Sequence, residues 1–119
     1  MPRFVILTHD HPILHWDFLL EFGDSCRTWR LSRSPDGTVP ISAEAVADHR
    51  LAYLDYEGPV SGNRGTVSQW DVGTFEVQSE TSTEIVIQLT GCKLSGLVRL
   101  TDPMDGQWQW WISQAGIVR

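Results

Sequence analysis

The sequence predicts an all-β protein, a β-barrel of about eight mostly antiparallel strands with one short helical segment. Three observations support this fold class. Apolar and polar residues alternate over 15–22, β-branched residues gather in the later segments, and Gly, Ser and Asp separate these segments. The segments recur at roughly 8–12 residues, as in sandwiches and barrels. A chain of 119 residues fits one domain, so we expect residues 1–119 to fold as a single unit.

The first half of the chain predicts a hairpin. A first strand is expected to end at His9. In 15–22 the even positions are Trp, Phe, Leu and Phe, whereas the odd ones are His, Asp, Leu and Glu. This period of two predicts a strand with one core face and one mostly polar face. Gly23-Asp24 then forms a turn, residues 26–31 form the returning strand, and Ser-Pro-Asp-Gly at 34–37 is a strong turn signal.

The second half predicts further strands. These are expected over 66–70, 74–78, 84–90, 94–100 and 107–112. Residues 42–56 contain Ala and Glu, which favour helix locally, so we expect an extended stretch leading into one helical turn around 48–55. Several residues are expected to be buried in the core: Trp16, Trp29, Trp108, Trp110, Cys26 and Cys92.

Composition narrows the function classes. The 15 acidic and 9 basic residues give a net charge of −6, which argues against a protein that coats nucleic acid with a basic face. It does not exclude an enzyme that binds a single phosphate end. No apolar run approaches the ~20 residues of a membrane span. Two cysteines 66 positions apart, with no CxxC pair and no signal-peptide pattern, indicate a reducing, cytoplasmic compartment.

Chemistry-bearing residues gather between positions 9 and 17. Three of the four histidines lie in 9–15, and Asp17 follows His15 by two positions. On a strand, positions 15 and 17 point to one face about 6.6–7 Å apart, so both side chains can converge on one ion. The turn-prone residues 10–12 allow His9 to return beside them. Two imidazoles and one carboxylate form a three-ligand site suited to Mn²⁺, Fe²⁺ or Zn²⁺, which can polarise a phosphoryl oxygen.

The same histidines and aspartate also fit two different roles. Three histidines within seven residues could be surface turn residues, and His11, next to a proline, is expected to be exposed to solvent. The bare triad also fits the two-His-one-carboxylate site of an iron oxygenase, although the sequence shows no pattern for anchoring a cosubstrate.

A wider motif adds to this pattern. The segment His9-x5-His15-Trp-Asp17-Phe-Leu-Leu-Glu resembles H-x5-H-[YW]-D-F-R-L-E, the opening motif of the 3′-phosphoesterase domain of bacterial DNA ligase D. Segments 25–35, 48–58, 65–74 and 89–96 resemble four further blocks of that family, in the same order. The resemblance covers nearly the whole chain and implies a compact β-barrel with a metal site in a groove.

The resemblance also implies roles for individual residues. His9, His15 and Asp17 match the ligands of Mn²⁺, with Zn²⁺ or Co²⁺ as alternative ions. His49 and Tyr53 match the pair that contacts the scissile phosphate, with His49 as acid or transition-state donor. Spaced four apart on a helical turn, they would share one face.

The basic residues are where the chain departs from the family. Arg33 stands where the family has a basic phosphate contact. Leu19 replaces the arginine of D-F-R-L-E, and we expect it at the edge of the metal groove because it shares a strand face with Asp17. A second family base falls near Ile41. Arg64 and Arg27 are the candidates to restore the lost charge.

The expected function is a manganese-dependent phosphoesterase acting on 3′ ends of DNA or RNA–DNA. It would remove a 3′-phosphate or a terminal ribonucleotide to leave a 3′-OH. The alternative is a non-catalytic module that binds a metal or a nucleic-acid end and has lost phosphate-binding arginines. Because the sequence carries no polymerase or ligase domain, we expect a free-standing, monomeric homologue that works with a separate repair ligase or polymerase and not at a membrane.

Overall fold

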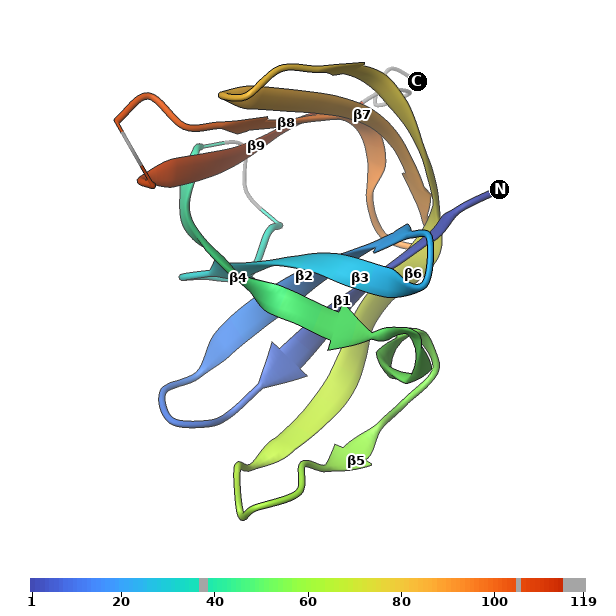
Figure 1. Ribbon diagram of the computed structural model, residues 1–119, viewed down its shortest axis with the longest axis vertical. Coiled ribbons are helices and arrows are strands. Elements are labelled where there is room, and N and C mark those ends of the chain that lie inside the picture. Colours follow the sequence, from blue (N-terminus) through green and yellow to red (C-terminus); the bar gives the residue numbers. More distant parts are fainter. Residues whose placement is uncertain (37–38, 105, 115–119) are drawn as a thin grey trace.

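The protein, here a computed structural model, is described at residues 1–36, 39–104 and 106–114 (Figure 1). The described elements are one 3₁₀ turn and nine strands. They are β1 (Arg3–His9), β2 (His15–Phe22), β3 (Ser25–Leu31), β4 (Ile41–Arg50), η1 (Leu51–Leu54), β5 (Gly58–Pro59), β6 (Thr66–Glu80), β7 (Glu84–Gly91), β8 (Ser95–Thr101) and β9 (Trp108–Gln114). No helix in these ranges is long and apolar enough to cross a membrane.

The strands form a closed antiparallel barrel, which confirms the predicted fold class. Their order is β1-β2-β3-β4-β9-β8-β7-β6, and pairing of β1 with β6 closes the ring. The short β5 pairs with the first two residues of β6, Thr66 and Val67, and is not part of the closed ring. Each of the eight described strands of the ring thus has a neighbour on both sides, which removes a site for unwanted strand pairing.

Strand β6 corrects one sequence prediction. The two strands expected over 66–70 and 74–78 form one strand of 15 residues, which runs through both halves of the molecule (Figure 1). Asp71 and Gly73 resemble turn residues in the sequence, but both sit within the strand. Its first half pairs with β1 and its second half with β7, so tertiary pairing keeps the backbone extended across this point.

Strand β4 corrects a second prediction. The helical turn expected over 48–55 is limited to η1, because β4 continues to Arg50. Its pairing with β3 runs from Ala43, opposite Leu31, to Arg50, opposite Ser25. This ladder overrides the local helix preference of Ala and Glu. His49 therefore lies on a strand.

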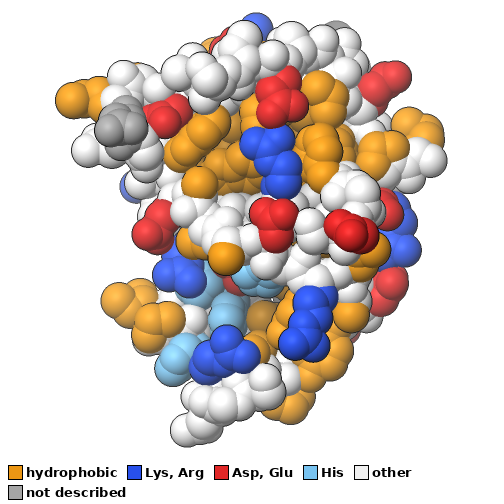
Figure 2. All heavy atoms as spheres, in the orientation of Figure 1, with side chains coloured by type: hydrophobic (Ala, Val, Ile, Leu, Met, Phe, Trp, Pro, Cys, Tyr) orange, Lys and Arg blue, Asp and Glu red, His pale blue; other side chains and the backbone are white. Residues whose placement is uncertain are grey.

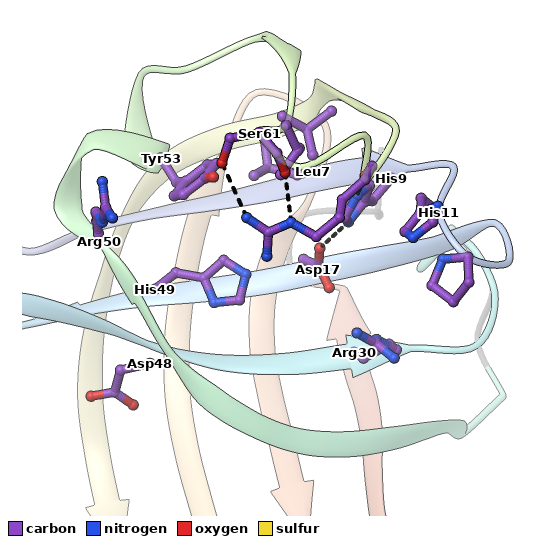
Figure 3. A pocket seen from close by; sticks show the side chains of 14 residues that line it. Leu7, His9, His11, Asp17, Arg30, Asp48, His49, Arg50, Tyr53 and Ser61 are labelled. Carbon is purple, nitrogen blue, oxygen red and sulfur yellow. Dashed lines mark hydrogen bonds and ion pairs between the residues drawn. The ribbon is translucent and has the colours of Figure 1, made fainter.

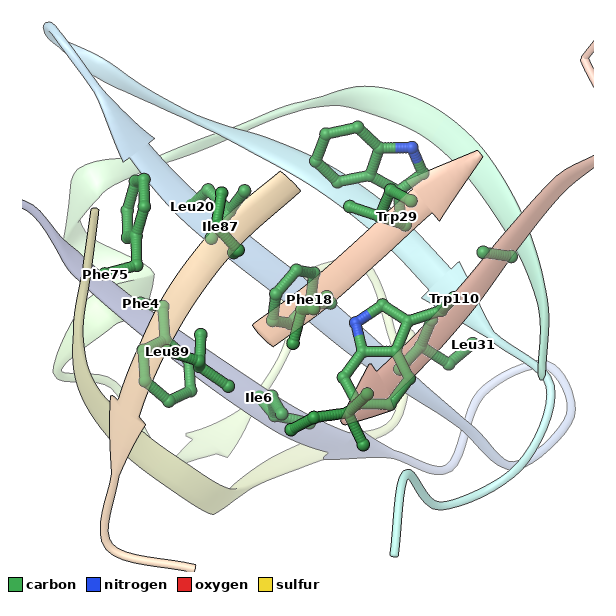
Figure 4. Close-up of a cluster of buried hydrophobic side chains, with 14 of the residues drawn as sticks. Phe4, Ile6, Phe18, Leu20, Trp29, Leu31, Phe75, Ile87, Leu89 and Trp110 are labelled. Carbon is green, nitrogen blue, oxygen red and sulfur yellow. The ribbon is translucent and has the colours of Figure 1, made fainter. Parts of the chain in front are cut away.

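The main core fills the barrel with aromatic and aliphatic side chains (Figure 4). The rings of Phe18 and Trp110 meet edge to face with centroids 5.8 Å apart, and Phe18 also contacts Phe4 and Trp29. Such pairs contribute ~0.5–1.5 kcal/mol beyond area burial. Trp29 and Trp110 are buried as predicted, and Trp16 and Trp108 pack against the cluster partly buried.

A second apolar cluster lies outside the barrel wall and corrects the expectation for Leu19. The odd face of β2 was expected to be mostly polar, yet Leu19 is fully buried. It is therefore not at the edge of a groove. Residues from η1 and from the chain around β5 and β6 cover this face. The cluster comprises Val5, Leu7, Leu19, Cys26, Leu54, Val60 and Val67.

The two cysteines differ in burial. Cys26 is buried as expected, and burial together with the negative charges of Glu21 and Asp48 raises its thiol pKa to about 11. Cys92 is exposed, contrary to expectation, because it lies in the turn after β7.

The thiolate is the reactive form of a cysteine side chain. We expect a disulfide reagent at pH 8 to modify one thiol of the native protein and the second only after unfolding. In Cys92→Ser the fast reaction should disappear; fast modification of that variant would contradict this assignment.

Candidate active site

A hollow of about 470 Å³ opens on the outer side of the barrel wall. It is lined by residues from β1, β2, β3, β4, η1 and the loop between β5 and β6. The space-filling view shows histidine side chains gathered in this hollow with arginine side chains around its rim (Figure 2). The close-up shows His9, Asp17 and His49 facing the same space (Figure 3).

The three predicted metal ligands converge at one end of the hollow. His9 and His15 are direct partners in the ladder between β1 and β2, and their ring centroids lie 4.8 Å apart. Asp17 follows on the same face of β2. His15 and Asp17 are buried, and one donor atom from each of the three residues lies within 4.8 Å of the others. The strand pairing itself, rather than a returning turn, brings His9 to the site.

Hydrogen bonds fix which ring nitrogens face Asp17. The Nε2–H of His9 donates to the carbonyl of Arg64 at 2.9 Å, so Nδ1 faces Asp17 Oδ2 at 3.2 Å. The Nδ1–H of His15 donates to the carbonyl of Ile13 at 2.8 Å, so Nε2 faces Asp17 Oδ1 at 3.1 Å. That Nε2 is buried and has no hydrogen-bond partner among the described residues. With neutral rings, both lone pairs point at a carboxylate, an arrangement that a cation between them would stabilise.

The donor set fits a divalent transition metal. Bonds of ~2.0–2.2 Å from a metal to imidazole nitrogen and carboxylate oxygen place two ligands at right angles about 3 Å apart. The observed separations are 3.1 Å from His15 Nε2 to Oδ1 and 3.2 Å from His9 Nδ1 to Oδ2, so each imidazole lies at this spacing from one oxygen of Asp17. Two nitrogen donors and one oxygen donor leave positions for water or substrate. The carbonyls of Ile13 and Arg64 orient the rings in the way that outer-shell partners orient metal ligands.

The electrostatics of the group favour a bound cation. Burial opposes the charged form of Asp17, but the neighbouring His15, with smaller effects from His49 and His9, holds the pKa of Asp17 below its usual 3.8. Burial also opposes the charged form of His15. Asp17 and the Ile13 carbonyl outweigh that effect and raise the pKa of His15 above 6.5. The carboxylate therefore stays ionised and attracts a positive charge.

The predicted phosphate-contacting pair lies across the hollow. The rings of His49 and Tyr53 meet edge to face with centroids 5.5 Å apart, and both line the hollow. His49 comes from β4 and Tyr53 from η1, so a strand and a 3₁₀ turn join them rather than one helical face. The Nδ1–H of His49 donates to the carbonyl of Ala47 at 3.1 Å. This bond leaves Nε2 available to a ligand.

The arginines are distributed differently from the prediction. Arg64 lines the hollow, and its Nε and Nη2 donate to the carbonyl and hydroxyl of Ser61 at 2.7 and 3.2 Å. Arg33 is exposed and lies outside the residues that line the hollow. Arg30 and Arg50 line it instead. Strand alternation could have identified Arg30, because Trp29 faces the core and its neighbour on β3 must face outward.

The turn after β1 forms one wall. His11 was expected to be exposed, but it is half-buried and lines the hollow. The Thr66 N–H donates to Asp10 Oδ1 at 2.8 Å and fixes this turn against the start of β6. Gly65 has a φ of 78°, and a side chain there would collide with Asp10 and His11. Glycine is thus required for the close approach.

Fold and site together define a small antiparallel β-barrel domain whose hollow combines a His-His-Asp donor set with arginines. The DNA Ligase D 3′-phosphoesterase domain model matches residues 7–102, and the chain belongs to this family. The chain is also 32% identical, over an alignment 126 positions long, to the multifunctional non-homologous end joining protein LigD of Pseudomonas aeruginosa. That alignment covers 95% of this chain and 15% of the relative, so the chain spans a small part of the relative's length. The family resemblance drawn from the sequence motifs is confirmed.

Proposed function

We propose that the protein is a manganese-dependent phosphoesterase that processes 3′ ends of DNA or RNA–DNA. It would remove a 3′-phosphate or a terminal ribonucleotide and leave a 3′-OH, which a separate repair ligase or polymerase could use. The observation that carries the proposal is the buried, unpartnered Nε2 of His15 directed at Asp17, in a hollow that also holds His49 and Tyr53. The family supports a phosphoesterase role.

The residues of the hollow have separable roles in such a reaction. A Mn²⁺ ion held by His9, His15 and Asp17 would supply Lewis acidity and a water of lowered pKa. His49, oriented by its bond to Ala47, presents Nε2 to the hollow, where its protonated form can donate to the leaving oxygen. The Tyr53 hydroxyl orients the phosphate, and the nearby arginines offset its negative charge.

A non-catalytic end-binding module is the second candidate. Leu19 favours it, because the family motif has an arginine at this position and Leu19 is buried in the apolar cluster. Such a module would keep the cation site and the arginines of the hollow without turning over the phosphate.

Incubation with a 5′-labelled DNA strand that ends in a 3′-phosphate separates the two candidates. The proposal predicts conversion to the 3′-OH strand with Mn²⁺ and none with EDTA. A strand with one terminal ribonucleotide tests the second reaction in the same assay. Binding of the strand without conversion, with Mn²⁺, Zn²⁺ or Co²⁺, would favour the binding module and contradict the enzyme.

His49→Ala should reduce the rate far more than the stability. General acid–base groups contribute ~10²–10⁴-fold in rate, and His49 is only half-buried on β4. We expect the free energy of unfolding to change by less than about 0.5 kcal/mol. Single-turnover rates and urea denaturation measure the two effects. His49→Gln, which keeps a polar amide but cannot titrate, is the matched variant and should be equally slow. Wild-type rates in either variant would remove His49 from the mechanism.

A further inference from the structure

A second hollow adjoins the first beside the cation site. It has a volume of about 290 Å³ and shares Pro12 and Arg30 with the first hollow. His15 lines it as well. One wall is the loop between β1 and β2, and the other is where the end of β3 meets the start of β4. The Ser32 N–H donates to the Ser42 carbonyl at 3.1 Å and fixes that second wall.

Arg30 lines both hollows, and its guanidinium makes no hydrogen bond to the described residues. It is the ladder partner of Asp17, so its side chain lies beside the cation site (Figure 3). The nearest carboxylate, that of Glu44, is 3.9 Å away, beyond hydrogen-bond distance. The buried Nε has no hydrogen-bond partner among the described residues. By contrast, the arginines at 3, 27 and 99 are bonded to carboxylates at 2.9, 2.9 and 3.2 Å. Arg30 is therefore available to a phosphate oxygen.

The lining of the second hollow matches the chemistry of a nucleoside. Ile13 and Leu14 are 76% and 52% exposed, an unusual degree for large apolar side chains, and they can contact the flat face of a base. Ser32, Ser42 and Glu44 on the opposite wall offer hydroxyl and carboxylate groups to the polar edge of a base or to a sugar hydroxyl. The volume of the second hollow, about 290 Å³, is close to the lower limit of ~300 Å³ for small-molecule sites and suits a ligand the size of a single nucleoside.

We propose that the second hollow is the subsite for the nucleoside whose 3′ oxygen carries the phosphate, and that Arg30 binds this phosphate where the two hollows meet. The assignment rests on the proposed function and specifies how its substrate lies. In this assignment Arg30 of β3 provides a guanidinium to the site, whereas Leu19 of β2, which stands where the family motif has an arginine, provides none. The hollow on the other side, of about 250 Å³ beside Tyr53 and Tyr56, includes no residue of the cation site.

Two substrates test the assignment with Mn²⁺ present: a DNA strand ending in a 3′-phosphate, and p-nitrophenyl phosphate, which lacks a nucleoside. Arg30→Gln should raise KM at least about tenfold for the strand, as expected for loss of a charge-assisted contact, and should slow the small ester as well. The double variant Ile13→Ser, Leu14→Ser should raise KM for the strand only. Its side-chain changes leave the Ile13 carbonyl that orients His15 in place.

Arg99→Gln is the matched control. Like Arg30, Arg99 projects from a strand toward a glutamate of a neighbouring strand. The Arg30 side chain is 40% exposed and that of Arg99 is 44% exposed. Arg99 lies outside the hollows described above, so neither substrate should be affected. The assignment is wrong if Arg30→Gln behaves like Arg99→Gln. It is also wrong if Arg50→Gln, at the Tyr53 side, raises KM for the strand while the double variant does not.

Binding to the metal-free protein separates this assignment from the proposed function. Fluorescence anisotropy with the labelled 3′-phosphate strand in EDTA requires no turnover. Weaker binding by Arg30→Gln and by the double variant, with Arg99→Gln unchanged, supports the subsite even if the wild type hydrolyses neither substrate. Equal binding by all four proteins would overturn the subsite even if the wild type is an active phosphoesterase.

Discussion

Replacing Asp17 with asparagine should weaken Mn²⁺ binding by at least about 100-fold and reduce phosphoesterase activity to a similar degree. Loss of a single outer-shell partner already costs ~10–100-fold in metal affinity, and Asp17 would be a direct ligand. Asparagine keeps the shape but removes the charge that both imidazole lone pairs face at 3.1 and 3.2 Å. Titration of Mn²⁺ followed by electron paramagnetic resonance measures the affinity without relying on turnover.

Asp24→Asn is the control for this experiment. Asp24 is exposed in the turn between β2 and β3, and its substitution removes the same charge from the chain at a position outside the hollow. The Mn²⁺ affinity of this variant should equal that of the wild type. Unchanged affinity in Asp17→Asn would show that the ion binds elsewhere, and the proposed ligand set would then be wrong.

Replacing Asp71 with alanine should lower the free energy of unfolding by roughly 3–5 kcal/mol. Asp71 is buried in the middle of β6, and its carboxylate accepts four backbone N–H groups. Oδ1 bonds to the N–H of residues 72, 92 and 93 at 2.8–2.9 Å, and Oδ2 bonds to that of Leu94 at 2.9 Å. The carboxylate thus ties the turn between β7 and β8 to β6. Its loss removes four bonds, and of the four donors the Cys92 N–H keeps a bond to the Val72 carbonyl at 3.2 Å.

Urea denaturation measures this effect. Asp24→Ala, at an exposed turn, should change the free energy of unfolding by less than about 0.5 kcal/mol. Because Asp71 does not line the hollow, Asp71→Ala should still bind Mn²⁺ at temperatures where it is folded. A loss of stability below about 1 kcal/mol would contradict a structural role for these four bonds.

Local patterns in the sequence predicted much of the fold and the convergence of the three residues of the candidate cation site. Alternation along β2 places His15 and Asp17 on one strand face, and the order of the motifs along the chain indicates the family. The alternation and each motif are patterns of residues close together along the chain, so they can be identified from the sequence alone. The pairing of His49 with Tyr53 was likewise predicted, although the backbone between them is a strand end followed by a 3₁₀ turn.

The features that the sequence did not predict depend on contacts between distant segments. Leu19 is buried because η1 and the chain around β5 cover the outer face of β2, and alternation alone cannot show such a cover. Arg33 and Arg30 are three residues apart, and only the ladder between β2 and β3 shows that Arg30 lies opposite Asp17. Strand β4 extends further than the local helix preference of its residues suggests, because β3 pairs with it as far as Arg50.

Anomalous diffraction at the manganese edge tests the central claim most directly. Crystals of the wild-type protein soaked in MnCl₂ should show one strong peak in the hollow, ~2.0–2.3 Å from His9 Nδ1, His15 Nε2 and a carboxylate oxygen of Asp17. Open positions on the ion should face His49 and Arg30. A peak elsewhere would contradict the proposed site. So would an Asp17 side chain that points into solvent more than about 5 Å from both imidazoles, because one ion could not then bind all three residues.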